Sequence, residues 1–551
     1  MRTFYSPALS GGIWQGKGKV LANRDPGPAA GKGAGLEAFL LLGTIGVGHF
    51  LVLFNTGAYL PMIPRVAGSL GVNPAYVDWT QDDFFWAMAF AFPLASWYSG
   101  LLGERRGLLL AFLGFAGASA VAADTAGYGW FLAARIAQGL TGGMTLPLSL
   151  PVILRHYSPA RKNIGLTLWG AASVAPFSLG PAVGGWMGDF PGWRWLFRLN
   201  VPVAMVVAVS LALLLREQKP RPDAVPRPRL DVLGLLLLVF GVGAWQSALN
   251  LGTMRDWLHS PTITALLVGG TAGILYFGVC SWNRPGSFLA LDLLRRRNFA
   301  VAASGLFLAA LCFQGTLALY VVQFQLSFGY TAFLVGLSLL PMAVLSKVGS
   351  MLTHHYLQRL DPRFLGVPAL LGFAFGSFWI ASCSRQPSPD ALFWPPLLLG
   401  AFLGTLFPPF VTIGLAGLEK PMEMRGAAFL NFLRSTGQAM GIPLVAAFWE
   451  RRNVLHHHFL VEDGAQAATQ FQLAQRGLES STGMAPPAAR LVLARSISYH
   501  AALLSFSEVF WCAGWACSAL CLLLLLARPE KAQVARKDTR SQQSLEELVE
   551  P

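Results

Sequence analysis

Long apolar segments recur along almost the whole of this chain, and they restrict its fold more than any other feature. Most of them hold about 20 residues, the length that an α-helix needs to cross roughly 30 Å of hydrocarbon. Inside hydrocarbon every backbone polar group must be bonded within its own segment, so the runs predict an all-α polytopic membrane protein. The pattern contains about fourteen such runs. They begin near Leu36, Phe84, Leu108, Trp130, Ile164, Trp195, Leu230, Ile263, Phe299, Thr331, Leu365, Leu392, Ala427 and Ala501.

The composition and the placement of charge agree with a membrane protein. Of the 551 residues, 54% are hydrophobic and 12% are charged, whereas soluble chains carry about 25% charged residues. The formal net charge of +14 lies in short basic clusters between the apolar runs, which argues against a nucleic-acid-binding surface. These clusters fall in alternate loops, so the positive-inside rule predicts that both termini are cytoplasmic.

Motifs of enzymes and metal sites are missing from the sequence. It contains no HExxH, GxSxG or P-loop pattern, and its six cysteines form no CxxC pair. We therefore expect no enzymatic activity, no cofactor and no metal site. The run of His456, His457 and His458 leaves one alternative open, because it either binds a metal or lies in a solvated segment beside the membrane.

Three stretches are more specific than generic apolar sequence. The fourth run contains RIAQGLTGGMTLPLS, which begins at Arg135, and YSPARKN follows it. The third stretch is SLGPAVGGWMGDFPGWRWLFRLNVP, which ends at Pro202. This succession resembles the EmrB/QacA-type drug:proton antiporters, the fourteen-span branch of the major facilitator superfamily. Weaker similarities, such as LNFLRSTGQAMG in the thirteenth run, extend the resemblance over roughly residues 40–529.

The resemblance implies two six-helix bundles around a central cavity, with two additional spans between them, and alternating access to a site near the membrane midplane. The expected parts are a cytoplasmic tail (1–35), an N-terminal bundle (36–216), a cytoplasmic linker (217–229), two additional spans (230–283), a C-terminal bundle (284–527) with an outer loop (450–500), and a cytoplasmic tail (528–551).

The resemblance also implies a function. A protein of this family is expected to be a secondary active exporter of lipophilic or amphipathic toxic compounds, driven by proton antiport, in the inner membrane of a bacterium. In a Gram-negative source, its partners would be an EmrA-like membrane-fusion adaptor and an outer-membrane channel. The alternative is an uncoupled or differently coupled carrier of a narrow metabolite class.

Two motifs carry residues that are unusual inside a membrane. Gly180, Pro181, Gly184 and Gly185 form a GPxxGG motif, in which proline breaks a helical hydrogen bond and glycines allow close helix contact. The resemblance assigns this motif to the hinge between the bundles, and an ordinary kink is compatible with that role. Arg135 either faces the bundle interior, where the resemblance ties it to proton transfer, or extends to the headgroups.

Two amides stand where the family usually has acids. Asn55 occupies the place of an aspartate in the first span, and Asn250 occupies the place of a second acid at the end of the seventh. Neither amide can carry a proton, so proton coupling requires other carboxylates. Asp82 and Asp83 are candidates, although TQDD is also typical of a helix N-cap followed by acids. Glu508, inside the last span, should be either protonated or paired.

The remaining candidates are cavity-lining residues and a gating loop. Asn431, Arg434 and Gln438 share one helical face, which either lines the cavity or joins helices. The full set of cavity-lining candidates is Asn55, Tyr59, Trp86, Gln138, Asn431, Arg434 and Gln438. The loop after the second span carries Gly100, Glu104, Arg105 and Arg106 in a degraded form of the superfamily's gating loop, and a plain positive-inside loop is an equal interpretation.

Overall fold

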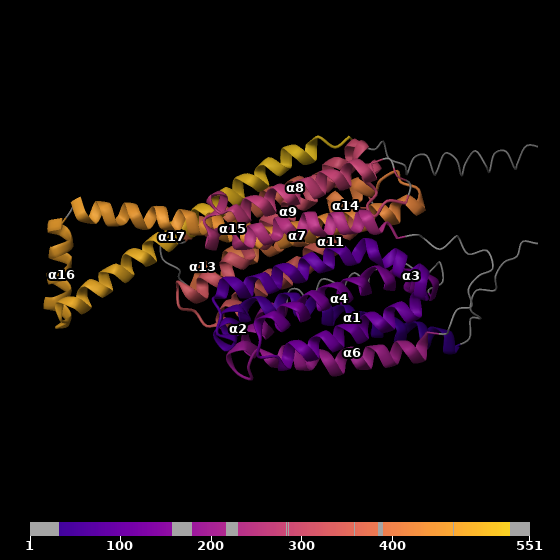
Figure 1. Cartoon of the computed structure of the whole chain (residues 1–551), viewed down its shortest axis with the longest axis horizontal. Helices are drawn as coiled ribbons and strands as arrows, with labels where there is room; N and C mark the ends of the chain where they lie inside the picture. Colours follow the sequence, from indigo (N-terminus) through magenta and orange to yellow (C-terminus); the bar gives the residue numbers. More distant parts are fainter. Residues whose placement is uncertain are drawn as a thin grey trace, which may run out of the picture.

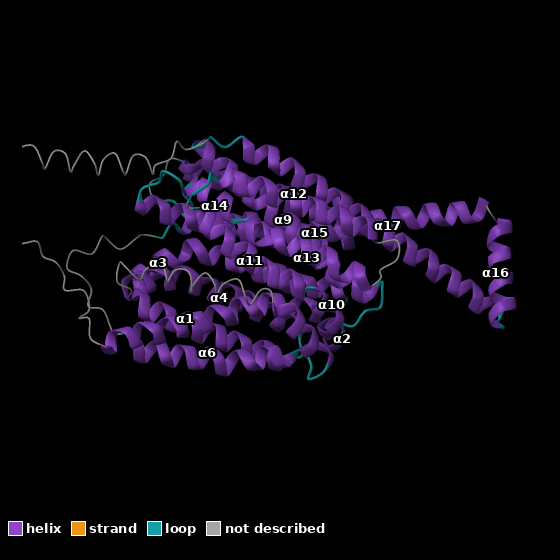
Figure 2. Cartoon of the chain, turned by 180° about the vertical axis from the view of Figure 1, so that it is seen from behind, coloured by secondary structure: helices purple, strands orange, loops and turns teal. Residues whose placement is uncertain are grey.

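Helices make up all the regular structure that the computed structural model describes, which comprises residues 32–156, 179–215, 230–282, 284, 286–357, 359–383, 389–466 and 468–528 (Figure 2). The first half contains α1 (Lys32–Tyr59), α2 (Ile63–Leu70), α3 (Pro74–Asp124), α4 (Tyr128–His156), a helical segment at 179–189, and α6 (Arg194–Leu214). Next come α7 (Val232–Gly252), α8 (Pro261–Ser281), α9 (Arg297–Leu326), α10 (Ala332–Ser338), α11 (Leu340–Tyr356) and α12 (Pro362–Cys383). The chain continues with α13 (Pro389–Leu406), α14 (Pro408–Leu415), α15 (Lys420–Gln466), α16 (Ala468–Thr482) and α17 (Pro486–Leu525). Short 3-10 turns lie at Leu60–Met62, Thr253–Arg255, Trp257–His259 and Leu291–Arg295.

Eleven of the described helical stretches are long and apolar enough to cross a membrane. One of them, α3, covers two predicted spans. Its backbone leaves the helical conformation at Gly103, between those two spans. The predicted thirteenth span coincides with the first part of α15. The predicted fifth span, with Trp169 and Phe177, and the predicted linker fall largely outside the described residues. The all-α polytopic fold class is confirmed.

The helices form two groups that lie side by side (Figure 1). In the first group α3 packs against α4 and α6, and α1 packs against α6. In the second group α15 packs against α9 and α17, and α12 packs against α13 and α17. Helix α7 packs against α8 and also contacts both α3 and α15. Helix α7 therefore lies beside the boundary of the two groups, where α3 and α15 also pack directly against each other.

A helical projection extends from one end of the bundle. It consists of α16 and the parts of α15 and α17 that leave the bundle (Figure 1). The predicted outer loop at 450–500 is thus mostly helical and not an irregular loop. We call this end of the molecule the projection end. Helix α1 begins and α17 ends at the opposite end (Figure 1).

The base of the projection is fixed by an ion-pair cluster between α15 and α17. Glu508 accepts hydrogen bonds from Nε and Nη2 of Arg452, the latter at 2.7 Å. Nε2 of His456 lies 3.0 Å from the same carboxylate. His458 pairs with Glu462 one turn further along α15, at 3.4 Å. No group of three metal-ligating side chains occurs in the described part of the chain.

Candidate functional site

Arg135 is fully buried in the first group of helices, so its side chain faces the interior and not the headgroups. Its Nη1 donates to Oδ1 of Asn55 at 2.8 Å and to Oε1 of Gln138 at 3.1 Å. Its Nη2 donates to Oε1 of Gln81 at 2.7 Å. The three acceptors come from α1, α4 and α3, so this one cation joins three helices.

Aromatic rings cover the faces of the same guanidinium. Its carbon lies 4.2 Å from the ring centroid of Tyr59, 4.5 Å from that of Phe84 and 5.8 Å from that of Phe197. A desolvated cation–π contact contributes about 2 kcal/mol, and hydrogen bonds to a charged group contribute about 1.5–3 kcal/mol each. No carboxylate of the described residues lies within ion-pairing distance of Arg135. Neutral dipoles and ring faces therefore stabilise its charge.

Further hydrogen bonds fix the orientation of two of the three amides. Nε2 of Gln138 donates to Oγ of Ser119 at 2.7 Å, and Nε2 of Gln81 donates to the carbonyl of Thr56 at 3.2 Å. Because these two nitrogens are engaged elsewhere, the amide oxygens of Gln138 and Gln81 point to the guanidinium. Nδ2 of Asn55 has no partner among the described residues. The sequence indicated Gln138 as a candidate but not Gln81, which directly precedes the candidate acids Asp82 and Asp83 in the chain.

Asn55 lies directly against Arg135, as the hydrogen bond shows. At this position an aspartate would form a buried ion pair, whereas the amide supplies only a dipole. The predicted cavity-lining residues Asn55, Tyr59 and Gln138 thus gather around one cation.

Asp82 is the one fully buried carboxylate among the described residues, and neither of its oxygens has a hydrogen-bond partner there. Asp78 lies one turn earlier on α3, and its Oδ1 also lacks a partner within the described part. Asp83 is half-buried. The N-cap of α3 is Asn73, whose Oδ1 accepts from the backbone N–H of Ala75 at 3.0 Å. The capping interpretation of Asp82 and Asp83 is therefore wrong, because the helix begins two turns before them.

Glu508 is in a different situation from Asp82. Its carboxylate is bonded to Arg452 and His456 and is 34% exposed. Of the two states that sequence reasoning left open for Glu508, the structure contains the paired one.

The GPxxGG motif forms tight contacts with both groups of helices. A Cβ atom on Gly184 would lie 2.0 Å from the carbonyl oxygen of Ala58 in α1. A Cβ atom on Gly185 would lie 2.2 Å from the carbonyl oxygen of Ala332, where α10 begins. Only glycine allows such close approach of two backbones. The motif thus lies where α1 and α10 meet the helical segment at 179–189.

Asp189 connects the two groups just beyond this motif. Its Oδ2 accepts from the backbone N–H of Phe333 in the first turn of α10 at 2.8 Å. Its Oδ1 accepts from Nη2 of Arg65 in α2 at 2.8 Å. Both α2 and α10 lie at the projection end (Figures 1 and 2). The bond to Phe333 therefore ties the two groups together at that end, and the bond to Arg65 holds Asp189 within the first group.

The predicted polar stripe of α15 does not join the Arg135 cluster. Asn431 donates to the carbonyl of Ala427 in its own helix at 2.9 Å, and Nε of Arg434 has no partner among the described residues. Gln438 is buried. Trp86 packs on Phe90, with ring centroids 5.2 Å apart. Asn250, the second replaced acid, accepts from Nε2 of Gln246 at 3.4 Å.

The predicted gating loop lies at the break in α3. Gly103 has φ 75°, a backbone conformation that favours glycine. Nη2 of Arg105 donates to the carbonyl of Ala212 near the end of α6 at 2.6 Å. The loop is therefore tied to α6, and Glu104 and Arg106 also take part in interactions.

A buried cation and a buried carboxylate inside a helical membrane bundle are typical of secondary transporters. Residues 45–442 match the family model of the Major Facilitator Superfamily, and the chain belongs to this family. The expected family membership is thereby confirmed.

Individual relatives cover nearly the whole chain. The chain is 28% identical to the multidrug export protein EmrB of Escherichia coli K12 over 90% of its own length and 96% of the relative's. It is 28% identical to the fatty acid resistance protein FarB of Neisseria gonorrhoeae, with 90% and 97% covered. Among solved structures, the peptide transporter POT in complex with sulfate has a similar fold, with a TM-score of 0.58 at 15% identity and 90% and 96% coverage.

Proposed function

We propose that this protein exports lipophilic or amphipathic toxic compounds in exchange for protons. The similarity to EmrB over nearly the full length of both chains supports multidrug export. The single structural observation that carries proton coupling is the buried, unpartnered carboxyl group of Asp82. None of the comparisons supports the alternative of a narrow metabolite carrier.

Asp82 is the proton carrier in this proposal. A carboxylate without hydrogen bonds inside a bundle is costly, so the neutral acid is the favoured form in this conformation. When the bundles rock and water reaches α3, the group ionises and releases its proton. Glu508 is less suited to this task, because the guanidinium of Arg452 is bonded to its carboxylate and stabilises the charged form.

Arg135 is the fixed charge of the cycle. Gln81, which accepts a hydrogen bond from Arg135, immediately precedes Asp82 in α3. The side chains of Gln81 and Asp82 therefore move with the same segment of that helix.

The hinge in this proposal is the contact of Gly184 and Gly185 with Ala58 and Ala332. These backbones are close enough to roll over each other without side-chain interference. Asp189, with its bonds to Arg65 and to the N–H of Phe333, holds the projection end closed. Opening that end requires the bond to the N–H of Phe333 to break, whereas the bond to Arg65 lies within the first group and can persist.

We propose that the chain lies in the inner membrane of a bacterium with both termini cytoplasmic. The projection then faces away from the cytoplasm, because it lies at the end opposite the first residues of α1 (Figure 1). Exposed apolar residues such as Leu473 and Leu491 make it suitable for docking an EmrA-like adaptor that leads to an outer-membrane channel.

The proposal is tested in proteoliposomes with an imposed pH gradient and a fluorescent substrate. We expect gradient-driven efflux by the wild type, and loss of that efflux with retained dye binding in Asp82→Asn. Asp256→Asn, an exposed acid between α7 and α8, is the matched control and should transport normally. Substrate movement indifferent to the gradient in the wild type would instead support an uncoupled carrier.

A further inference from the structure

A cavity of about 470 Å³ lies between α9, α15 and α17, apart from the Arg135 cluster. Its walls are mainly apolar, with Leu311 from α9, Val445 and Phe448 from α15, and Val509 and Ala513 from α17. Small-molecule sites in proteins typically measure about 300–1,000 Å³. The cavity is therefore large enough for an apolar ligand, and the transport proposal does not use it.

The side chains of Arg451 and Trp257 lie together at one end of this cavity. The guanidinium carbon of Arg451 lies 4.8 Å from the ring centroid of Trp257, and both residues line the cavity. Nε1 of Trp257 is buried and has no acceptor among the described residues. Within the same residues, no carboxylate pairs with Arg451. This end of the cavity thus carries an uncompensated positive charge beside an indole ring.

The backbone holds Trp257 in this place at some cost. Asp256 and Trp257 both have positive φ, at 57° and 49°. Non-glycine residues rarely adopt this conformation, which persists where the surrounding structure enforces it. The indole also packs against Gly252, where a Cβ atom would come within 2.8 Å of the ring. The connection between α7 and α8 therefore places the indole across the end of the cavity.

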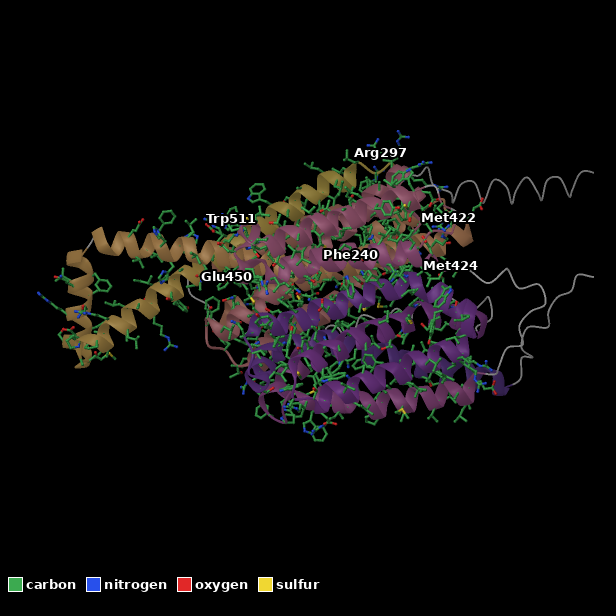
Figure 3. All side chains as sticks on the ribbon, viewed as in Figure 1. Phe240, Arg297, Met422, Met424, Glu450 and Trp511 are labelled. Carbon is green, nitrogen blue, oxygen red and sulfur yellow. The ribbon has the colours of Figure 1, made fainter. Side chains whose placement is uncertain are left out.

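The cavity opens sideways, toward the surface that lipid covers. Leu444 and Phe448 on α15 are 41% and 40% exposed, and Cys512 on α17 is exposed. From Leu444 to Arg451 the cavity follows α15 for about 10 Å at 1.5 Å per residue. Figure 3 labels Glu450 and Trp511, the chain neighbours of Arg451 and Cys512, toward the projection end of the bundle. The apolar part therefore lies deeper in the membrane than the cation.

We propose that this cavity binds a single-chain anionic amphiphile, with its acyl chain between α9, α15 and α17 and its carboxylate at Arg451 and Trp257. The guanidinium of Arg451 matches a carboxylate, and its uncompensated charge disfavours a cationic headgroup. The acyl chain then lies deeper in the membrane and the carboxylate lies nearer the projection end. A lipid in the leaflet at the projection end has the same orientation, and the ligand would enter from that leaflet. The site is separate from Asp82 and does not depend on proton coupling.

The test uses palmitate that carries a photoactivatable diazirine in its chain, with the purified full-length protein in nanodiscs. Mass spectrometry of the cross-linked peptides should place the label at 311–316, 444–451 and 509–516. Arg451→Gln should weaken labelling at least about tenfold, since a charge-assisted hydrogen bond is lost. Arg495→Gln, an exposed arginine of the projection, is the matched control and should label as the wild type does.

Two further measurements separate this site from general contact with lipid. The methyl ester of the same probe should label at least about tenfold less, because it lacks the charge. Ala516→Trp, which fills the cavity, should abolish labelling. The proposal would be overturned if the probe labelled all lipid-facing helices evenly, or if the ester labelled the cavity as strongly as the acid. It would also be overturned if phospholipid displaced the probe as effectively as palmitate does.

Discussion

At the scale of single residues, the bundle treats its buried cation and its buried acid in opposite ways. Arg135 has three amide acceptors, two of them held by further hydrogen bonds, and two close ring faces, so its charge is stable in every step that preserves the cluster. Asp82 has no partner among the described residues. A group held in one charge state suits anchoring, and a group that must change its charge state suits proton transfer.

Removing one acceptor of Arg135 should destabilise the fold. Gln81→Leu deletes a charge-assisted hydrogen bond and leaves part of the guanidinium unsatisfied, at a cost of about 1.5–3 kcal/mol. Gln325→Leu is the matched control, because Gln325 is half-buried and bonds only to its own helix. Unfolding in mixed micelles measures both, and equal losses in the two variants would refute the importance of the cluster.

The sequence was informative about residues whose chemistry is unusual inside a membrane. Arg135 stood out because charge is rare there, and Asn55 stood out because it replaces a familiar acid. Gln81 carried no such signal, since a glutamine inside a span is compatible with many roles. The pairing of Glu508 with Arg452 joins residues on different helices, and helical spacing alone does not predict such a contact.

At the scale of helices, run length predicted most elements but not the projection. Residues 450–500 are too polar for a span, and that composition favoured a loop. They form helices because α15, α16 and α17 contact one another and because Pro486 begins α17. The start of α3 could have been found, since Asn73 followed by Pro74 is a typical N-cap and first helical residue.

The close contact of the GPxxGG motif gives an element-scale prediction. Gly184→Ala places a Cβ atom 2.0 Å from the carbonyl oxygen of Ala58, so the two helices must separate. We expect a loss of about 1–3 kcal/mol in stability and a clear fall in transport. Gly117→Ala, on an exposed face of α3 with open space around it, should be neutral or slightly stabilising. Thermal unfolding and efflux assays measure both, and a fully active Gly184→Ala would contradict the hinge.

At the scale of the whole molecule, the two groups of helices pack against each other through α3 and α15, and Asp189 and Gly185 join them at the projection end. The projection itself leaves the bundle beyond the cluster of Glu508 and Arg452. Transport and partner docking are therefore expected to reside in separable parts of the chain.

Replacing residues 464–488 with a flexible linker should separate these two activities. Because the cluster at the base is retained, we expect transport in proteoliposomes within about twofold of the wild type, since the replaced contacts lie outside the bundle. Drug resistance of cells that rely on the adaptor should be lost. Loss of transport in liposomes would show that the projection belongs to the transport machinery.

The central claim is that Asp82 exchanges a proton for substrate, and proton release on substrate binding tests it most directly. Substrate is added to the purified protein in weakly buffered detergent solution with a pH-sensitive dye. The account predicts release of protons by the wild type and none by Asp82→Asn, with substrate still bound. Undiminished release by Asp82→Asn would contradict the account and assign the proton to another group.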